Sequence, residues 1–532
     1  MKRWILAVSF MVLIISTACF SAGKVSESGS KTSSDLAYIF QIPNEPYNVT
    51  VTLDPTIQAE ATIPASGGSV SVTGADGTTY QLDIPSGALV MDTLIRLIPV
   101  TQIDGMPFGS NPVAVQVVPE GLQLYATAIL TITPSQIIPI DQQIIFGYQG
   151  MGENLVLATP VAGSSEIKIQ LAHFSGYGVT TGFLADLASV RARLGGDAEA
   201  RMQSAMAERL GKARQVELLG AEEDSSPDFP AFSKEYIEKV IKPRIAAAGE
   251  SCAAGRLAVQ TVLGWERQRQ LLGVSDDSSP SEFDDKGLLE TVAAVCMKEE
   301  YELCRDQHII HRILPASLGL ERQSLLLGVT EDGGTTPTLE MAKDYVRRCL
   351  TFRLEFHSEG VLNDPNGNIY NSTVDSVVKL QFSTDDMSMH AQAPLVNTTF
   401  EFKMPGCKVT SNRGGGTFNA KQLIFYSDTH SSTDVVGYVR DFKLVYDPGI
   451  TSESFTVKCG DSGSYTSPPS AMWNAIFIPL HKSEVSLDDE GYIADTWEIL
   501  AGELYAKKEW IKDDAANDIT EVGTFKLYHT PG

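Results

Sequence analysis

Cysteine is the residue type whose count and spacing most directly indicate chemistry in this chain. Seven cysteines occur among 532 residues, and one of them, Cys19, follows a short apolar leader. The other six form an even set, which in an exported protein favours three disulfides over metal ligation. No two of them have the CxxC spacing of a zinc site. We therefore expect disulfides among Cys252, Cys296, Cys304, Cys349, Cys407 and Cys459.

A second group that could do chemistry is Cys304 with His308 and His311. Cys304 and His308 are four residues apart, so they share one face of a helix and could form half of a metal site. No second pair of ligands is near in sequence, and Cys304 is better used in a disulfide. We therefore expect ordinary helix histidines, and we predict neither a metal nor a cofactor.

The leader before Cys19 has the form of an export signal. Two basic residues precede an apolar run over 4–15, which is too short for a stable membrane span, and small residues follow up to Ala18. The pattern resembles the signal of bacterial lipoproteins, which implies cleavage after Ala18 and a lipid on Cys19. Ser16 stands where that signal usually has Leu, so plain secretion with cleavage at the same bond is the alternative.

Residues 46–182 have the pattern of an antiparallel β-sandwich. Short β-rich runs alternate with Gly, Pro and Asn/Asp turns, and helical periodicity is almost absent. Four segments follow the order of the ZU-five domain, a β-module found in ankyrins, netrin receptors and many bacterial surface proteins; they are 67–70, 80–89, 95–100 and 117–122. This resemblance implies a module that binds proteins or acts as a spacer, without a catalytic cofactor.

The same region ends in His173-Phe174-Ser175. Some proteins of the resembled family cut themselves between Phe and Ser of such a sequence. The resemblance implies an acyl shift in which the Ser175 oxygen attacks the carbonyl of Phe174, His173 assists as base, and water resolves the ester. The interpretation that we favour is structural, with Phe174 in the core of the last strand and its two neighbours on the other face.

The middle of the chain, 183–351, is organised by an eleven-residue phrase that occurs three times. Leu-Gly-x-x-Arg-Gln-x-x-Leu-Leu-Gly ends at Gly220, Gly273 and Gly328, a period of 53 and then 55 residues. This period accommodates two helices and a loop, so we expect three αα-hairpin repeats, with a long first helix over 184–219 and a left-handed glycine closing each phrase.

The repeated phrase also predicts the place of its arginine and of the turn that follows. The arginine lies one turn before a leucine, so we expect half-buried guanidinium groups that bond a helix end or the next acidic turn. The acidic turns lack the alternation of a calcium-binding loop, which favours solvated turns. The three arginines are Arg214, Arg267 and Arg322.

The phase of the repeats predicts how their cysteines pair. Relative to the closing glycines, Cys252 and Cys304 occupy one phase and Cys296 and Cys349 the other. The pairs Cys252–Cys296 and Cys304–Cys349 then have nearly equal separations of 44 and 45 residues, as a repeated helix contact requires. The competing pair Cys296–Cys304 would need a broken helix. Cys407–Cys459 remains for the C-terminal region.

From residue 352 to 532 the alternation of strands and turns returns, which predicts a second antiparallel β-sandwich. Within it, 363–367 reads Asn-Asp-Pro-Asn-Gly and resembles the nucleophile motif of sucrose- and fructan-cleaving glycosidases, with Asp364 as the nucleophile. Retaining hydrolysis needs two carboxylates, and no partner motif follows. A hairpin turn explains the same residues, and a glycan-binding or glycan-active domain stays a weaker alternative.

Charge and composition limit the kinds of partner. The net charge of −25 disfavours nucleic acid and anionic membrane surfaces, which would repel the chain. We expect a non-enzymatic lipoprotein of the bacterial cell envelope with a signal peptide (1–18), a lipid-anchored flexible linker (19–45) and the three regions above. Its partner would be an unknown protein or glycan, and self-cleavage at Phe174–Ser175 is the alternative function.

Overall fold

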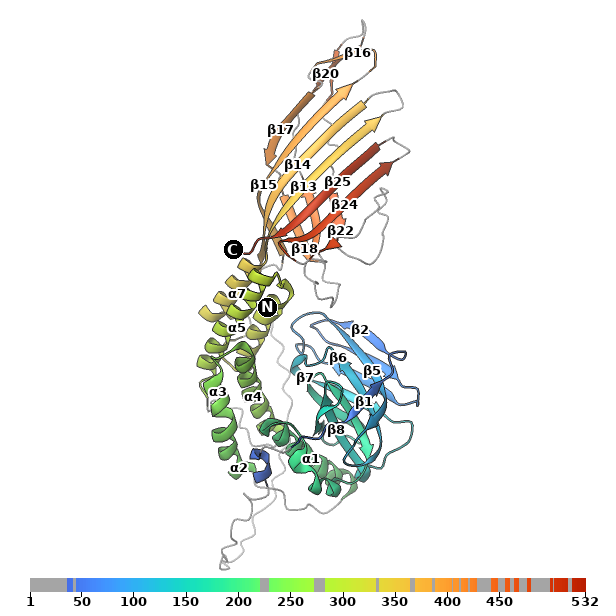
Figure 1. Ribbon diagram of the computed structural model, residues 1–532, viewed down its shortest axis with the longest axis vertical. Coiled ribbons are helices and arrows are strands. Elements are labelled where there is room, and N and C mark those ends of the chain that lie inside the picture. Colours follow the sequence, from blue (N-terminus) through green and yellow to red (C-terminus); the bar gives the residue numbers. More distant parts are fainter. Residues whose placement is uncertain are drawn as a thin grey trace, which may run out of the picture.

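The computed structural model shows a mixed α and β protein with two β-regions and a run of helices between them (Figure 1). Cys19, the rest of the leader and Asp364 lie outside the described residues. The structure describes residues 36–532 except 42–44, 221–228, 272–282, 332–333, 364–368, 385–387, 404, 411–412, 420–421, 428–441, 448–454, 460–463, 468–475, 480–497, 501 and 515–518.

The N-terminal β-region consists of two antiparallel sheets. The seven-stranded sheet has the order β1 (Thr50–Leu53), β5 (Thr93–Asp104), β6 (Ser110–Val118), β12 (Gly176–Thr181), β8 (Gln143–Gln149) and β9 (Glu153–Leu157), with β2 (Ala59–Ile63) paired to β5. The five-stranded sheet has the order β10 (Thr159–Pro160), β11 (Ile167–His173), β7 (Gln123–Thr133), β4 (Thr79–Ile84) and β3 (Gly68–Thr73).

The two sheets share one hydrophobic core. Leu82, Leu130 and Ile169 are register partners on neighbouring strands of the five-stranded sheet, and all three are 0% exposed. Leu97 and Val117, which pair in the seven-stranded sheet, belong to the same cluster of buried side chains. The alternation of apolar and polar residues therefore buries one face of each sheet in a common interior.

Strand β8 is buried on both faces because a helical segment covers the outer side of its sheet. Its residues Ile144 and Phe146 pack against Leu187 and Leu194, whereas Ile145 belongs to the core between the sheets. A strand in this position reads as a continuous apolar run, because neither face meets water.

The predicted long helix over 184–219 is wrong in its first third. Two short 3-10 helices, η3 (Leu184–Ser189) and η4 (Arg191–Arg193), precede α1 (Ala198–Leu219). Gly195 has a φ of +100°, which an α-helix does not allow, and the side chain of Asp197 then accepts a hydrogen bond from the backbone N–H of Ala200. This N-cap places the start of the helix at Ala198, fourteen residues after the predicted start at 184.

The remaining helices stack beside one another along the chain. Within the described residues α4 packs on α3 and α5, and α5 packs in turn on α6 and α7. Gly220 and Gly328 have positive φ values of 65° and 67°, as the repeated phrase predicts, while Gly273 lies outside the described residues. The helices are α2 (Phe229–Tyr236), the π-helix η5 (Ile237–Ile241), α3 (Lys242–Ala247), α4 (Cys252–Leu271), α5 (Asp285–Gln307), η6 (Ile310–Arg312), α6 (Ile313–Leu326) and α7 (Pro337–Cys349).

Three disulfides are present, and they join the pairs that the spacing predicts. Cys252–Cys296 links α4 to α5, with 4.4 Å between the Cα atoms, and Cys304–Cys349 links α5 to α7, with 5.9 Å. Cys407–Cys459 joins two paired strands of the C-terminal region. In the part of the chain that is described, no helix has the length and apolar character needed to cross a membrane.

The C-terminal region contains a ten-stranded and a three-stranded antiparallel sheet among its described residues. The large sheet has the order β22 (Ile476–Pro479), β19 (Phe442–Asp447), β18 (Gln422–Ser427), β15 (Ser388–Lys403), β14 (Ile369–Ser383), β13 (Thr351–Asn363), β25 (Ile519–His529), β24 (Leu504–Asp514) and β23 (Glu498–Ile499), with β17 (Arg413–Asn419) on β15. The small sheet consists of β16 (Cys407–Thr410), β20 (Phe455–Cys459) and β21 (Ser464–Ser467).

One end of the large sheet continues the core of the helices. Phe352 and Leu354 of β13, Phe382 of β14 and Leu527 of β25 are at most 3% exposed and belong to the same cluster as the buried face of α5. In Figure 1 the sheet extends away from this end, on the opposite side of the helices from α1. The helices are therefore packed at both ends against β-structure.

Candidate functional site: a polar pocket between the N-terminal sheets and the helices

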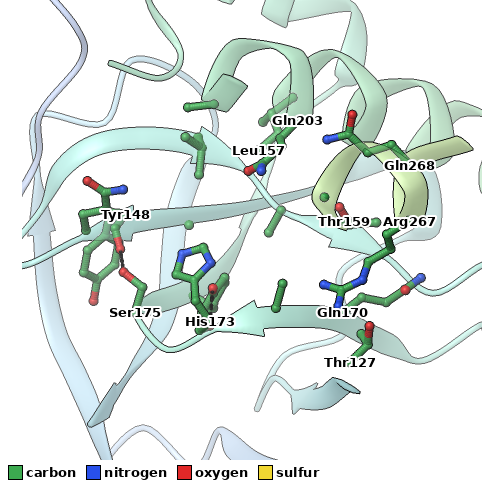
Figure 2. A pocket seen from close by; sticks show the side chains of 18 of the residues that line it. Thr127, Tyr148, Leu157, Thr159, Gln170, His173, Ser175, Gln203, Arg267 and Gln268 are labelled. Carbon is green, nitrogen blue, oxygen red and sulfur yellow. Dashed lines mark hydrogen bonds between the residues drawn. The ribbon is translucent and has the colours of Figure 1, made fainter. Parts of the chain in front are cut away.

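A pocket of 150 Å³ lies where the N-terminal sheets meet α1 and α4 (Figure 2). Strands β8, β9, β11 and β12 supply one wall, with His173 and Gln170 on β11. Helix α4 supplies the opposite wall with Arg267 and Gln268, and Gln203 comes from α1. None of the described residues that line the pocket is acidic, so Arg267 gives it a local positive charge within a strongly acidic protein.

Arg267 is the arginine of the second repeated phrase, and it points from α4 toward β11 in Figure 2. No hydrogen bond or ion pair joins it to another described residue, and burial lowers the pKa of its guanidinium below the usual value of 12.5. An arginine keeps its proton at neutral pH in spite of such a shift. Arg267 is thus a charged residue that lines the pocket without a hydrogen-bond acceptor among the described residues.

The arginines of the other two phrases also face the N-terminal sheets. Arg214 is 4% exposed and donates through Nε to the carbonyl of Ser164 at 2.7 Å and through Nη1 to Gln143 Oε1 at 2.9 Å. Arg322 lies against Gly87, where an added Cβ would come within 2.5 Å of its Nη2. The expected acceptors, a helix end or an acidic turn, are therefore wrong for Arg214, because its guanidinium donates to residues of the N-terminal β-region instead.

Glutamine side chains supply most of the remaining polarity of the pocket. Gln268 is 9% exposed, and its Oε1 is buried without a hydrogen-bond partner among the described residues. Gln170 donates from Nε2 to the carbonyl of Pro160 at 3.2 Å. Buried amide oxygens normally accept a hydrogen bond, so the Gln268 oxygen is an unsatisfied acceptor, and it is closed to a water-sized molecule in the pocket.

His173 and Ser175, the self-cleavage candidates, both line this pocket, and Phe174 between them is 0% exposed in the core. Burial lowers the pKa of His173 below 6.5, which keeps its ring neutral at pH 7. The Ser175 hydroxyl does not bond to this ring in Figure 2; it lies 3.0 Å from Glu120 Oε1 and also contacts the carbonyl of Tyr148. The residue in the position of a base is therefore Glu120 rather than the expected His173.

The peptide bond between Phe174 and Ser175 is held by the backbone of the turn before β7. The N–H of Gly121 donates to the Phe174 carbonyl at 2.9 Å, and the Phe174 N–H donates to the carbonyl of Leu122 at 2.9 Å. A donor on this carbonyl would stabilise the oxyanion that forms if the Ser175 oxygen attacked it. Glu120 and Gly121 belong to the segment 117–122, whose sequence indicated the domain type and not a role in this site.

The histidines near Cys304 form a different cluster, away from this pocket. His308 Nδ1 lies 2.8 Å from Nδ1 of His529, whose Nε2 lies 2.8 Å from the carbonyl of Cys349. Burial lowers the pKa of His529 to about 4. Ligand atoms of Cys304, Cys349 and His529 lie within 4.8 Å of one another, but both sulfurs are used in the disulfide. The side chain of His311 lies outside the described residues.

The chemistry of the pocket thus comes from three parts of the chain that are distant in sequence. Strand β11 brings His173 and Gln170, the corner between β11 and β12 brings Ser175, and α4 brings Arg267 and Gln268. The arrangement can bind an anion, and it places the Ser175 hydroxyl beside the carboxylate of Glu120, which does not itself line the pocket. No model of a known protein family matches the chain, and no curated protein matches it.

Proposed function

We propose that this protein is a non-enzymatic lipoprotein of the bacterial cell envelope whose role is to bind a ligand between its N-terminal sheets and its helices. The pocket carries the binding role, because it holds the charge of Arg267 without a protein partner among the described residues. The three disulfides support an oxidising compartment outside the cytoplasm. The leader and Cys19 supply the route of export and the membrane anchor.

The finer architecture in this proposal follows the sequence expectations. The N-terminal region is a ZU-five-like β-sandwich, which the common core of its two sheets supports, together with positive φ values of 75° at Gly87 and 73° at Gly121 in the motif turns. The helices are αα-hairpin repeats, supported by the left-handed Gly220 and Gly328. The C-terminal sandwich stays a prediction, supported by the antiparallel pairing of its strands.

The anchor is tested by partitioning the expressed protein between detergent and water. Wild type enters the detergent phase and the Cys19→Ser variant stays in the aqueous phase, because only the cysteine thiol can take the lipid. A Ser21→Ala variant is the control and partitions like wild type. Recovery of wild type and Cys19→Ser alike in water would refute lipid attachment.

Self-cleavage at Phe174–Ser175 is the second candidate, and the contact between Ser175 and Glu120 favours it. Glu120 would take the hydroxyl proton as the Ser175 oxygen attacks the Phe174 carbonyl, while the Gly121 N–H bonds the oxyanion. The C–N bond then breaks and the nitrogen takes the proton, which leaves an ester. Water hydrolyses this ester to a carboxylate on Phe174 and restores the Ser175 hydroxyl, beside the amine that the preceding step freed.

Two contacts oppose that reaction in the folded chain. The serine has one proton, so a bond to the carbonyl of Tyr148 competes with the bond to Glu120. Phe174 is fully buried, and the N–H and carbonyl groups of its backbone are both bonded to the turn at 121–122. We therefore rank the intact peptide first, and a partner that is a protein or glycan outside the pocket stays a further prediction.

A further inference from the structure

The two disulfides of the helices occupy equivalent positions of the repeats but have different neighbours. Cys304 and Cys349 form a group with His529 in which one ligand atom from each residue lies within 4.8 Å of the others. Cys252 and Cys296 belong to no such group among the described residues. The disulfide between neighbouring helices therefore does not itself require a histidine, and the group at the second disulfide needs an explanation of its own.

The spacing between Cys304 and His529 is that of two ligands on one zinc ion. Sγ of Cys304 lies 3.5 Å from Nε2 of His529. A zinc–sulfur bond of about 2.3 Å and a zinc–nitrogen bond of about 2.0 Å at the tetrahedral angle place the two ligand atoms roughly 3.5 Å apart. The sulfurs cannot bind a metal while they are bonded to each other. After reduction they have only to separate to about 3.8 Å, the distance that two zinc–sulfur bonds require.

His308 provides the hydrogen bond that would orient the ring of His529 as a ligand. Nδ1 of His308 lies 2.8 Å from Nδ1 of His529, whereas Nε2 of His529 faces the carbonyl of Cys349 and the sulfur of Cys304. When Nε2 binds a metal, the ring carries its proton on Nδ1 and donates it to His308. Histidine ligands almost always have such a partner on their second nitrogen, which fixes the tautomer and the orientation of the ring.

Burial and charge favour a divalent cation that binds sulfur. Cys304 and Cys349 are 0% exposed and His529 is 1% exposed. Two thiolates and a neutral imidazole carry two negative charges, which a divalent cation cancels, so that no net charge is buried. The cysteines lie in the last turns of α5 and α7, where the helix dipoles also favour a cation. Sulfur ligands select zinc over magnesium and calcium, which prefer oxygen.

We propose that Cys304, Cys349 and His529 form a zinc site when a dithiol reduces the disulfide. In this exchange the two sulfurs of the reductant become a disulfide, and the protein gains two thiols. Zinc displaces the two thiol protons and bonds to both sulfurs and to Nε2, which leaves one tetrahedral position for water. The buried sulfurs react when this end of the helices opens locally. Zinc would restore the link between α5 and α7 that reduction removes, and extend it to β25.

The test is zinc binding by the purified full chain before and after reduction. A dithiol reduces the protein and is removed without oxygen, and binding is measured by competition with a chromogenic chelator. We expect reduced wild type to bind one more zinc ion than the oxidised chain, and at least tenfold weaker binding in His529→Gln and in Cys304→Ser/Cys349→Ser. The matched control, Cys252→Ser/Cys296→Ser, lacks the equivalent disulfide and should keep the additional zinc. Circular dichroism shows that each variant is folded.

The inference is overturned by any of three results. Oxidised and reduced wild type would bind the same number of zinc ions, or a folded His529→Gln variant would bind zinc as tightly as wild type after reduction. In the third result reduced wild type loses its structure and zinc does not restore it. Loss of the additional zinc in Cys252→Ser/Cys296→Ser alone would likewise place the site at the wrong disulfide.

Discussion

Replacing Arg214 with methionine should detach helix α1 locally from the N-terminal sheets. Methionine keeps the apolar stem and removes the guanidinium, which is 4% exposed. The bonds of Arg214 to the Ser164 carbonyl at 2.7 Å and to Gln143 Oε1 at 2.9 Å are lost, and its longer bonds to Ser165 and Glu166 lie in an exposed loop that water can reach. At about 1.5 kcal/mol for each of the two short bonds, the loss is about 3 kcal/mol.

Hydrogen exchange measures this loss where it occurs. The N–H of Val161 donates to the carbonyl of Lys168 at 2.9 Å and closes the loop that Arg214 holds. A loss of about 3 kcal/mol should speed exchange of this amide by on the order of 100-fold, since 1.4 kcal/mol corresponds to a factor of ten. The assay compares Arg214→Met with wild type by mass spectrometry of peptides that cover 158–170.

The matched control is Lys212→Met on the same helix. Lys212 is 42% exposed in its side chain and pairs at 3.2 Å with Glu208, which is buried but keeps its bonds to Arg191, so the loss of this half-exposed contact costs at most about 1 kcal/mol. We expect almost unchanged exchange in the loop. If Arg214→Met and Lys212→Met exchanged at the same rate, the repeated arginines would not fasten the helices to the β-region, and the reasoning about Arg267 would lose its comparison.

Three further predictions concern the other sites. The mature chain should run as one band on a denaturing gel; a fragment that begins at Ser175 and is abolished by Ser175→Ala would establish self-cleavage instead. Replacing Cys304 and Cys349 by serine should lower the free energy of unfolding of the helices by about 4 kcal/mol for a separation of 45 residues, measured by denaturant unfolding, and an unchanged midpoint would contradict this. Because burial lowers the pKa of His529 from 6.5 to about 4, the unfolded chain takes up a proton there that the folded chain does not, so stability should fall by on the order of 3 kcal/mol as pH drops from 6.5 to 4. Thermal melts should show a flatter pH profile in His529→Gln, and identical profiles would refute the assignment.

The features that the sequence predicts best are those that repeat. The closing glycines Gly220 and Gly328 adopt the left-handed conformation, because a repeated Gly after paired leucines has few other uses. The cysteine pairs follow from the same period, since equivalent helix contacts impose equivalent separations. The first helix was harder to place, because apolar spacing continues through Leu184 and Leu187 although Gly195 and Asp197 set the true start.

The pocket could not be predicted, because its walls come from regions that show no common pattern. Arg267 and Arg214 occupy the same position of the repeated phrase. They differ in their surroundings, because Arg214 bonds to a loop of the β-region and Arg267 lines the pocket. Glu120 and Ser175 are separated by 55 residues and come together only when the strands pair. The signal present in the sequence was the arginine of each phrase. Arg214 does find acceptors, but on the β-region rather than on a helix end or an acidic turn, and Arg267 has none among the described residues.

The junction between α7 and β13 connects the helices rigidly to the large sheet. Cys349 ends α7 and Thr351 begins β13, so only Leu350 separates them, and this residue is 1% exposed with its N–H bonded to the carbonyl of Val346. Strand β13 lies inside the sheet between β14 and β25, and Cys349 is covalently tied to α5. A displacement of the large sheet would therefore move α7 through β13, and it would move α5 through the disulfide. Rotation of the sheet relative to the helices would require separating the side chains of their shared core.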